Sequence, residues 1–269
     1  MSEAYLNRFA GIGRLYGQAA LTAFADAHVV VVGVGGVGTW VAESLVRSGI
    51  GQISLIDLDD ICVTNTNRQI HAIAQTIGQS KVEVMAKRIR DINPECQVNE
   101  IEDFVTLDNL NEHFPRTDNG SVTHIDYVVD CIDAVKQKAA LIAHCKRNKL
   151  PLITIGGAGG QTDPSQIQIT DLAKTIQDPL LAKVRSILRK DYGFSKNTQR
   201  RFAIDAVFST QHLVYPQADG SVCNTKATAD GSMRMDCASG FGAVTMVTGT
   251  FGFMAASRVL AKLALKAKS

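Results

Sequence analysis

The sequence has 269 residues, of which 45% are hydrophobic and 20% are charged, and its formal net charge at pH 7 is +2. This length is enough for one large α/β domain or two small domains, and the composition excludes a disordered chain. The small net charge identifies no partner, so a nucleic-acid surface would have to be a local patch of cations.

Strands and helices are expected to alternate from residue 28 to residue 155. The segment 28–32 (HVVVV) is short, β-branched and followed by glycine, which is typical of a fully buried strand. Further strands are predicted at 53–57, 97–101, 125–130 and 151–155, and helices at 36–48, 80–92 and 134–148. This alternation indicates right-handed βαβ units, and therefore a Rossmann-like α/β fold with a mostly parallel sheet and helices on both faces.

The pattern changes after residue 160. Segments 166–170 and 202–208 alternate as half-buried strands do, which favours antiparallel pairing, and a charged helix is expected around 178–191 between them. Residues 209–236 are predicted to form a long loop. Residues 237–257 carry no charge and are long enough to span a bilayer, but their many Gly, Ser and Thr residues favour a long buried C-terminal helix.

No linker or internal repeat divides the sequence, so we expect a single domain over residues 1–269. Its parts are an N-terminal arm (1–27), a nucleotide-binding core (28–160) and a substrate-side extension with the last helix (161–269). The six cysteines form no C-x-x-C pair, which argues against structural zinc. The first residues lack the apolar segment of a secretory signal, so free thiols in a cytoplasmic protein are expected.

A glycine-rich loop joins the first predicted strand to its helix. Its glycines are Gly33, Gly35, Gly36 and Gly38, in a G-x-G-G-x-G pattern that allows a tight turn and brings a phosphate to a helix N-terminus. Asp57 ends the second strand about 20 residues later, where an acid that binds a ribose belongs. Together these residues predict a nucleotide site.

Three further features favour ATP over a nicotinamide cofactor. Asn65 and Arg68 follow the second strand in a polar loop, and Lys81 opens a helix whose dipole its charge opposes unless an anion is near. Asp130 ends a buried strand, where a carboxylate can hold Mg²⁺ between phosphates. Cleavage of a phosphate bond needs such charges, whereas hydride transfer does not. The alternative interpretation is that the loop with Asn65 and Arg68 and the Lys81 side chain are simply exposed to solvent. Asp133, close to Asp130, is expected to cap the helix that follows it.

The motifs GVGGVG, LIDLDDICVTNTNRQ, GQSKVEV and VVDCID resemble the adenylation core of the E1-like (ubiquitin-activating-type) family. The resemblance implies that Asp57 holds the ribose, that Asn65, Arg68 and Lys81 hold the phosphates, and that Asp130 holds magnesium. It also implies a homodimer in which an arginine near the N-terminus reaches the partner's phosphates. Arg8 matches that arginine best, and Arg14 is the alternative.

Outside this core the chain resembles one bacterial branch of the family, the tRNA threonylcarbamoyladenosine dehydratases. The stretches RLYG, GGAGGQ, DLAKTIQDPL, VYPQ and MRMDCASGFG carry this resemblance. It implies ATP-dependent adenylation of a tRNA-borne carboxylate, followed by ring closure. The alternative is an adenylyltransferase that activates a small sulfur-carrier protein, with cysteine-desulfurase relay proteins as partners. The missing C-x-x-C pairs disfavour that alternative.

Basic residues and one cysteine in the later half of the chain are further candidates. Lys183, Arg185, Arg189, Lys190, Lys196, Arg200 and Arg201 suit a tRNA backbone, with Tyr192 and Phe194 interleaved, although a solvated helix face fits nearly as well. Cys237 precedes the last helix and is a candidate sulfur acceptor, or else a small core residue. Since ring closure needs no thiol, Cys237→Ser is expected to keep activity. A monovalent cation near the glycine run 156–160 is left open.

Overall fold

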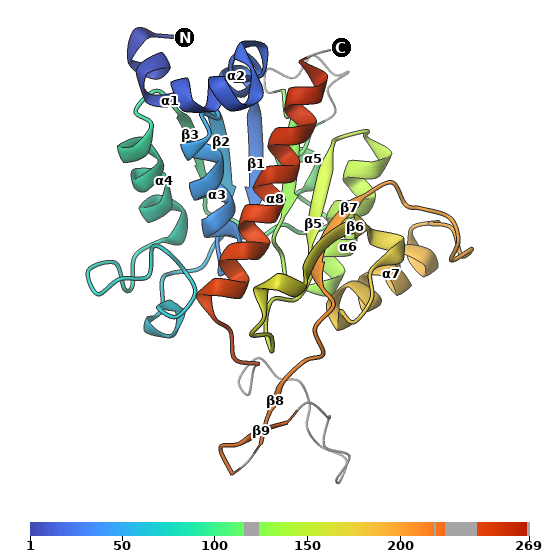
Figure 1. Ribbon diagram of the computed structural model, residues 1–269. Helices are drawn as coiled ribbons and strands as arrows, with labels where there is room; N and C mark the ends of the chain where they lie inside the picture. Colours follow the sequence, from blue (N-terminus) through green and yellow to red (C-terminus); the bar gives the residue numbers. More distant parts are fainter. Residues whose placement is uncertain (116–123, 218, 224–240, 268–269) are drawn as a thin grey trace.

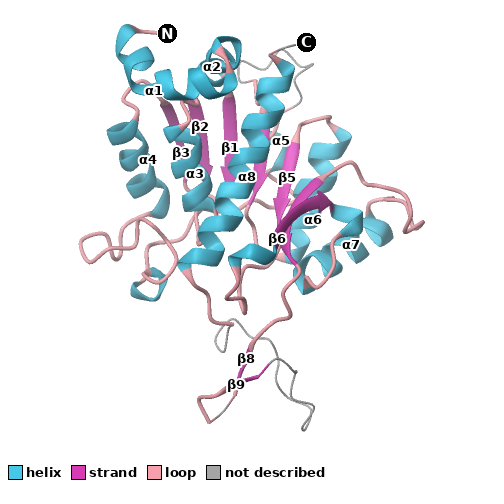
Figure 2. Cartoon of the chain, in the orientation of Figure 1, coloured by secondary structure: helices cyan, strands magenta, loops and turns pink. Residues whose placement is uncertain are grey.

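A seven-stranded sheet with helices on both faces forms the molecule in the computed structural model, which describes residues 1–115, 124–217, 219–223 and 241–267 (Figures 1 and 2). The strand order is β3-β2-β1-β4-β5-β7-β6, and only the β6–β7 pair is antiparallel. The predicted α/β class, the mostly parallel sheet and the antiparallel addition are confirmed.

The strands lie close to their predicted positions. Their bounds are β1 His28–Val32, β2 Gln52–Ile56, β3 Gln97–Ile101, β4 Tyr127–Asp130, β5 Leu152–Ile155, β6 Ile167–Asp171 and β7 Asp205–Ser209. Two short strands, β8 Tyr215–Pro216 and β9 Val222–Cys223, form a separate hairpin within the predicted loop.

The helices cover the sheet in two layers. Their bounds are α1 Glu3–Tyr16, α2 Gln18–Asp26, α3 Gly38–Arg47, α4 Lys81–Ile92, α5 Leu110–His113, α6 Val135–Arg147, α7 Pro179–Asp191 and α8 Thr245–Lys266. Because side chains alternate along a strand, β1 serves two cores. Val29 and Val31 pack with α2, α3, α4 and α8, whereas Val30 and Val32 face the core that contains α5, α6 and α7.

Residues 1–27 form two helices, which the sequence analysis had treated only as an arm. Tyr5 and Phe9 are buried one helical turn apart, and the Tyr5 hydroxyl donates a hydrogen bond of 2.5 Å to the Gly49 carbonyl oxygen. Helices α1 and α2 lie at the end of the sheet where β1 begins (Figure 1). The apolar spacing of Tyr5, Phe9 and Ile12 was the signal that could have predicted α1.

The long C-terminal helix α8 is confirmed and packs mainly along α3 and α2. Its small residues permit this close approach: a Cβ on Gly252 would lie 2.7 Å from the Trp40 Cβ. None of the helices in the described part of the chain is long and apolar enough to cross a membrane. The first residues of the uncharged segment, 237–240, lie outside the described ranges.

Candidate nucleotide-binding site

A pocket of about 980 Å³ lies at the carboxyl ends of β1, β2, β4 and β5. The chain order of the strands reverses between β1 and β4, and open parallel sheets bind ligands at such a switch point. The predicted site residues among those that line it are Gly33, Gly35, Gly36, Asp57, Asn65, Arg68 and Lys81. The tertiary structure therefore brings together most of the residues that the sequence analysis assigned to a nucleotide.

The glycine loop 33–38 turns tightly from β1 into α3. A Cβ on Gly38 would lie 1.8 Å from the Gly33 carbonyl oxygen, so no larger residue fits at this position. Helix α3 begins at Gly38, and among the described residues no side chain caps its N-terminus. Its first N–H groups and the positive end of its dipole are therefore available to an anion in the pocket.

Asp57 and Lys81 are linked through the loop that follows β2. The Asp57 carboxylate accepts hydrogen bonds from the backbone N–H of Val34 (2.6 Å) and of Asp59 (2.9 Å). The Lys81 ammonium lies 2.6 Å from Asp59 and 3.8 Å from Asp57, and only 7% of its side chain is exposed. The anion that Lys81 needs at its helix N-terminus is supplied here by two carboxylates. A cation so held can face phosphates without moving far.

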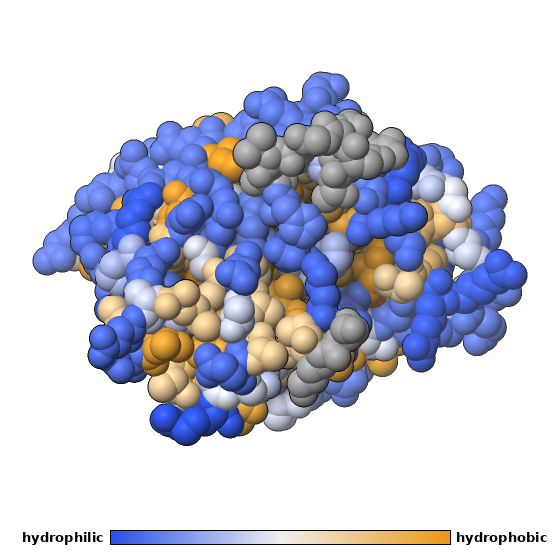
Figure 3. Space-filling view, turned by 90° about the horizontal axis from the view of Figure 1, so that it is seen from above, coloured by the Kyte–Doolittle hydropathy of each residue, from blue (hydrophilic) through white to orange (hydrophobic). Residues whose placement is uncertain are grey.

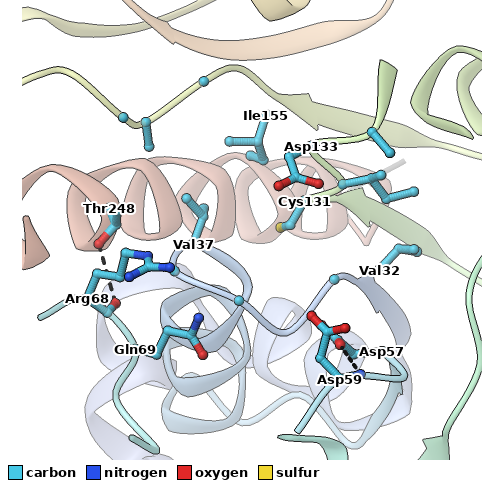
Figure 4. Close-up of a pocket in the computed structure, with 18 of the residues that line it drawn as sticks. Val32, Val37, Asp57, Asp59, Arg68, Gln69, Cys131, Asp133, Ile155 and Thr248 are labelled. Atoms are coloured by element: carbon cyan, nitrogen blue, oxygen red, sulfur yellow. Dashed lines mark hydrogen bonds between the residues drawn. The ribbon is translucent and has the colours of Figure 1, made fainter. Parts of the chain in front are cut away.

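Arg68 lies directly against the glycine loop. A Cβ on Gly36 would meet the Arg68 Cγ and Cδ atoms at 3.3 Å, so the absence of a side chain at Gly36 makes room for the arginine. The guanidinium donates hydrogen bonds to the Thr64 carbonyl and the Asn67 side chain, and the Arg68 carbonyl accepts one from the Trp40 indole. These bonds hold the Arg68 side chain beside the glycine loop, where it lines the pocket (Figure 4).

Asn65 and Gln69 are buried side chains of the same loop that carries Arg68. Asn65 caps a short 3₁₀ turn by accepting a hydrogen bond from the Cys62 N–H at 2.9 Å. Gln69 is buried against the pocket, and its Oε1 atom has no hydrogen-bond partner in the part of the chain that the structure describes. A buried amide oxygen without a partner is costly, and a ligand donor in the pocket would satisfy it. Gln69 was not predicted, although it belongs to the same NTNRQ run.

Asp130, the predicted magnesium ligand, does not line this pocket. Its side chain is fully buried beneath it, 3.0 Å from the equally buried ammonium of Lys138, and accepts hydrogen bonds from the Thr154 hydroxyl and the Ile132 N–H. Burial raises the pKa of this carboxyl, against the effect of Lys138. The contacts of Asp130 explain the difference, because its carboxylate is held beneath the pocket by Lys138 of α6 and by Thr154 of the neighbouring strand β5.

Asp133 takes the position that Asp130 was expected to occupy. It was predicted to cap the next helix, but the N-cap of α6 is Ala134, and the exposed Asp133 lines the pocket instead. Figure 4 shows it beside Cys131, across the glycine loop from Asp57 and Asp59. Cys131 also lines the pocket and is half-buried, and the desolvation of its thiol raises the pKa, which favours the protonated form.

Two other walls of the pocket were missed by the sequence analysis. One is the segment 103–106 after β3, in which Phe104 is half exposed. The other combines the glycine run that follows β5 with residues 241–243 before α8, and a Cβ on Gly159 would lie 3.1 Å from the Phe241 Cβ. No local motif marks Phe104. Phe241 belongs to the stretch MRMDCASGFG, but that stretch gave no reason to place it at the pocket, which it reaches only through the tertiary fold.

The remaining predicted residues lie away from the pocket. Arg8 is exposed on α1, at the opposite end of the sheet (Figure 1). Of the basic residues, Arg185 donates to the Thr175 hydroxyl, and Arg189 donates to the Ser195 carbonyl and lies over the Phe202 ring. The other five are exposed: Lys183, Lys190, Lys196, Arg200 and Arg201.

Tyr192 and Phe194 are partly buried against the core that contains α6 and α7, so they are not free faces for base stacking. Cys237 lies outside the described residues.

The charges in the pocket define what it can do. The lining carries two cations, Arg68 and Lys81, and the N-terminus of α3, around a space of the size that a nucleotide needs. It also carries four carboxylates, Asp57, Asp59, Asp103 and Asp133, of which the first two pair with Lys81. Arg68 and the helix N-terminus offer positive charge where negative charge develops when a phosphate bond breaks. The raised pKa of the Cys131 thiol makes it a poor nucleophile, although this residue lines the pocket.

Comparison with known proteins agrees with this description. The sequence matches the ThiF family over residues 7–269. It is 61% identical over 267 residues to a protein named tRNA threonylcarbamoyladenosine dehydratase from Escherichia coli (strain K12), covering 99% of this chain and 97% of that protein.

Two solved structures of the E. coli protein TcdA are similar over nearly the whole chain. The structure described as a complex with ATP has a TM-score of 0.86 and 54% identity, covering 99% of this chain and 98% of that chain. The structure described as a complex with AMP has a TM-score of 0.85 and 55% identity with the same coverage. The predicted resemblance is thus confirmed from end to end, and the chain belongs to the ThiF family, within which it groups with the tRNA threonylcarbamoyladenosine dehydratases.

Proposed function

We propose that this chain uses ATP to adenylate the carboxylate of threonylcarbamoyladenosine in tRNA, and that ring closure then releases AMP. One observation carries the proposal. The glycine loop, Arg68 and Lys81 line the same pocket in a chain that is 61% identical, over 99% of its length, to a dehydratase of that name. Related structures described with ATP and with AMP support ATP as the co-substrate and AMP as its product.

In the first step a substrate carboxylate oxygen bonds to the α-phosphorus of ATP, and the bond from that phosphorus to the pyrophosphate oxygen breaks. Negative charge grows on the departing pyrophosphate. Arg68, Lys81 and the N-terminus of α3 stabilise this charge because they are held in place before the reaction. The product is an acyl-adenylate, a far better electrophile than the original carboxylate.

In the second step the ureido nitrogen of the same modified base attacks the acyl carbon. The nitrogen loses its proton, the acyl–phosphate oxygen bond breaks, and AMP leaves with the oxygen that the carboxylate has lost. The nucleophile belongs to the substrate and is already close to the acyl carbon, so no enzyme nucleophile is required. The raised pKa of the Cys131 thiol, which disfavours the thiolate, is consistent with this route.

Magnesium fits the pocket through Asp133. Among the described residues, no group of three or more His, Cys, Asp or Glu side chains could hold a metal alone. Mg²⁺ bound to nucleotide phosphates needs only one or two carboxylates, with water and phosphate oxygens as its other ligands. Asp133 supplies an exposed carboxylate in the pocket, whereas the buried Asp130 does not. The ion would supply positive charge to the phosphates. The monovalent cation remains a prediction.

We also propose that the protein acts as a homodimer. Arg8 lies at the end of the sheet opposite the pocket of its own protomer, so it could assist only the pocket of a partner (Figure 1). The same helix exposes Leu15 at 76%, and burial of this apolar side chain in an interface would be favourable. The sulfur-relay partners gain no support from the described cysteines.

The proposed function is tested by incubating the protein with ATP, Mg²⁺ and tRNA that carries threonylcarbamoyladenosine, and then weighing the nucleosides of the digested tRNA. We expect the loss of one water from the modified nucleoside, with one AMP released per event. Pyrophosphate release that requires a ubiquitin-like carrier protein and ignores tRNA would favour the sulfur-carrier alternative. If the protein gives neither the loss of water nor carrier-dependent pyrophosphate release, both candidate functions are contradicted.

A further inference from the structure

A second cleft, of about 700 Å³, opens at the other end of the sheet. It lies where β4, β5 and β7 begin and where β6 ends, and the last turns of α8 close one side. This is the end of the molecule shown in Figure 3, where hydrophilic residues predominate. The cleft shares no residue with the nucleotide pocket, and we call it the α8 cleft.

Cations line the α8 cleft in a row. Arg258, Lys262 and Lys266 are spaced four residues apart, so they lie on one face of α8 at intervals of about 6 Å and over a length of about 12 Å. Lys174 and Arg201 face the same cleft from the segments that flank β6 and β7. Cations spaced along a line complement a polymer with regularly spaced negative charges. A small anion would instead be bound by cations that converge on one point.

Carboxylates neutralise only part of this charge. Asp205 lies 3.4 Å from Arg258, and Asp126 lies 3.0 Å from Lys266. Among the described residues, Arg201 and Lys262 have no carboxylate within ion-pair distance, and both are exposed. The five cations and three carboxylates of the lining leave a formal excess of two positive charges.

The third carboxylate, Asp171, builds the wall that carries Arg201. Its oxygens accept hydrogen bonds from the backbone N–H groups of Ala173, Phe202, Ala203 and Ile204. This grip holds Ala203 at φ 55°, a left-handed conformation that costs an alanine about 1 kcal/mol or more. The segment after Arg201 is therefore fixed, and the guanidinium is presented from a rigid support.

We propose that the α8 cleft binds the phosphodiester backbone of the RNA substrate, with Arg201 and Lys262 as its unpaired phosphate contacts. This inference rests on the proposed function, because it assigns a surface to the same substrate. The cleft and the pocket lie at opposite ends of β4, about 17 Å apart over the five residue steps from Asp126 to Cys131. A substrate that reaches both must be longer than a mononucleotide, and the proposed tRNA substrate meets this requirement.

The test is the affinity for tRNA as a function of salt, measured by filter binding with the full-length protein. The variant is Arg201→Ala/Lys262→Ala, and the matched control is Lys87→Ala/Arg90→Ala, which removes the same charge from α4 at the other edge of the sheet. Loss of two phosphate contacts should weaken binding about 25- to 60-fold at 0.1 M salt and reduce the salt slope by about 1.4–1.8. The control should bind as the wild type does.

Thermal unfolding of the double variant and of the control establishes that the fold is intact. The single variant Lys262→Glu should weaken tRNA binding at least as much as the loss of one phosphate contact does. Wild-type affinity and slope in the double variant and in Lys262→Glu would overturn the assignment. If the double variant loses binding to poly-glutamate but binds tRNA as the wild type does, the assignment to RNA is overturned in favour of an acidic protein partner. Failure of the wild type to dehydrate tRNA would instead reject the proposed function, so the two failures are distinguishable.

Discussion

Asp130 and Asp133 lie three residues apart, and substituting each by asparagine should have opposite effects on stability and on activity. In Asp130→Asn the fully buried Lys138 ammonium loses its counter-charge. Breaking a buried ion pair in this way costs about 3–5 kcal/mol. With a urea m-value of about 3 kcal/mol/M, the unfolding midpoint should fall by about 1–2 M.

Asp133→Asn should behave in the opposite way. Because Asp133 is exposed, its free energy of unfolding should change by no more than about 0.5 kcal/mol. If it holds the magnesium ion, the rate of AMP formation with tRNA should fall about 100-fold or more, the effect expected when one preorganised charge contact is lost. Folded Asp130→Asn protein should retain most of its rate, since its side chain does not reach the pocket.

Urea unfolding followed by circular dichroism and a steady-state assay of AMP release measure both quantities. The double variant Asp130→Asn/Lys138→Met is the control, because removal of both charges should restore most of the stability. The reasoning is refuted if Asp130→Asn is fully stable and inactive while Asp133→Asn remains active. That result would return the metal to Asp130.

The remaining predictions concern glycine positions and one histidine. Gly38→Ala should prevent stable folding, measured by urea titration, because its Cβ would lie 1.8 Å from the Gly33 carbonyl oxygen. In Gly35→Ala the nearest atom to the new Cβ would be 3.9 Å away, so this variant should fold normally and bind ATP more weakly, measured by calorimetry. Burial lowers the pKa of His71 from 6.5 to about 4, so the unfolded chain binds a proton that the folded chain does not, and stability falls as pH falls. The free energy of unfolding should be about 2 kcal/mol lower at pH 5 than at pH 8, and His71→Gln should remove this part of the dependence. Gly252→Val should lower stability by about 1–3 kcal/mol in thermal unfolding, because its Cβ would lie 2.7 Å from the tryptophan side chain, and an unchanged midpoint would contradict the packing described for α8.

The sequence by itself determined the order of the seven main-sheet strands along the chain and the centre of the nucleotide site. Buried strands such as 28–32 and the helix at 80–92 carry their periodicity in consecutive residues, so local patterns were sufficient to place them. The glycine loop, Asn65, Arg68 and Lys81 follow neighbouring parallel strands, and the carboxyl ends of such strands necessarily meet at one edge of a sheet.

Only the tertiary structure decided which side chains at that edge face the pocket. Asp130 and Asp133 differ by three residues, and the sequence offers no local reason to bury the first against Lys138 and to expose the second. Likewise, the row of cations on α8 joins Arg201, 57 residues before Arg258, only because β7 begins beside the last turns of that helix. Burial and charge pairing depend on contacts between distant segments, and a linear pattern does not contain them.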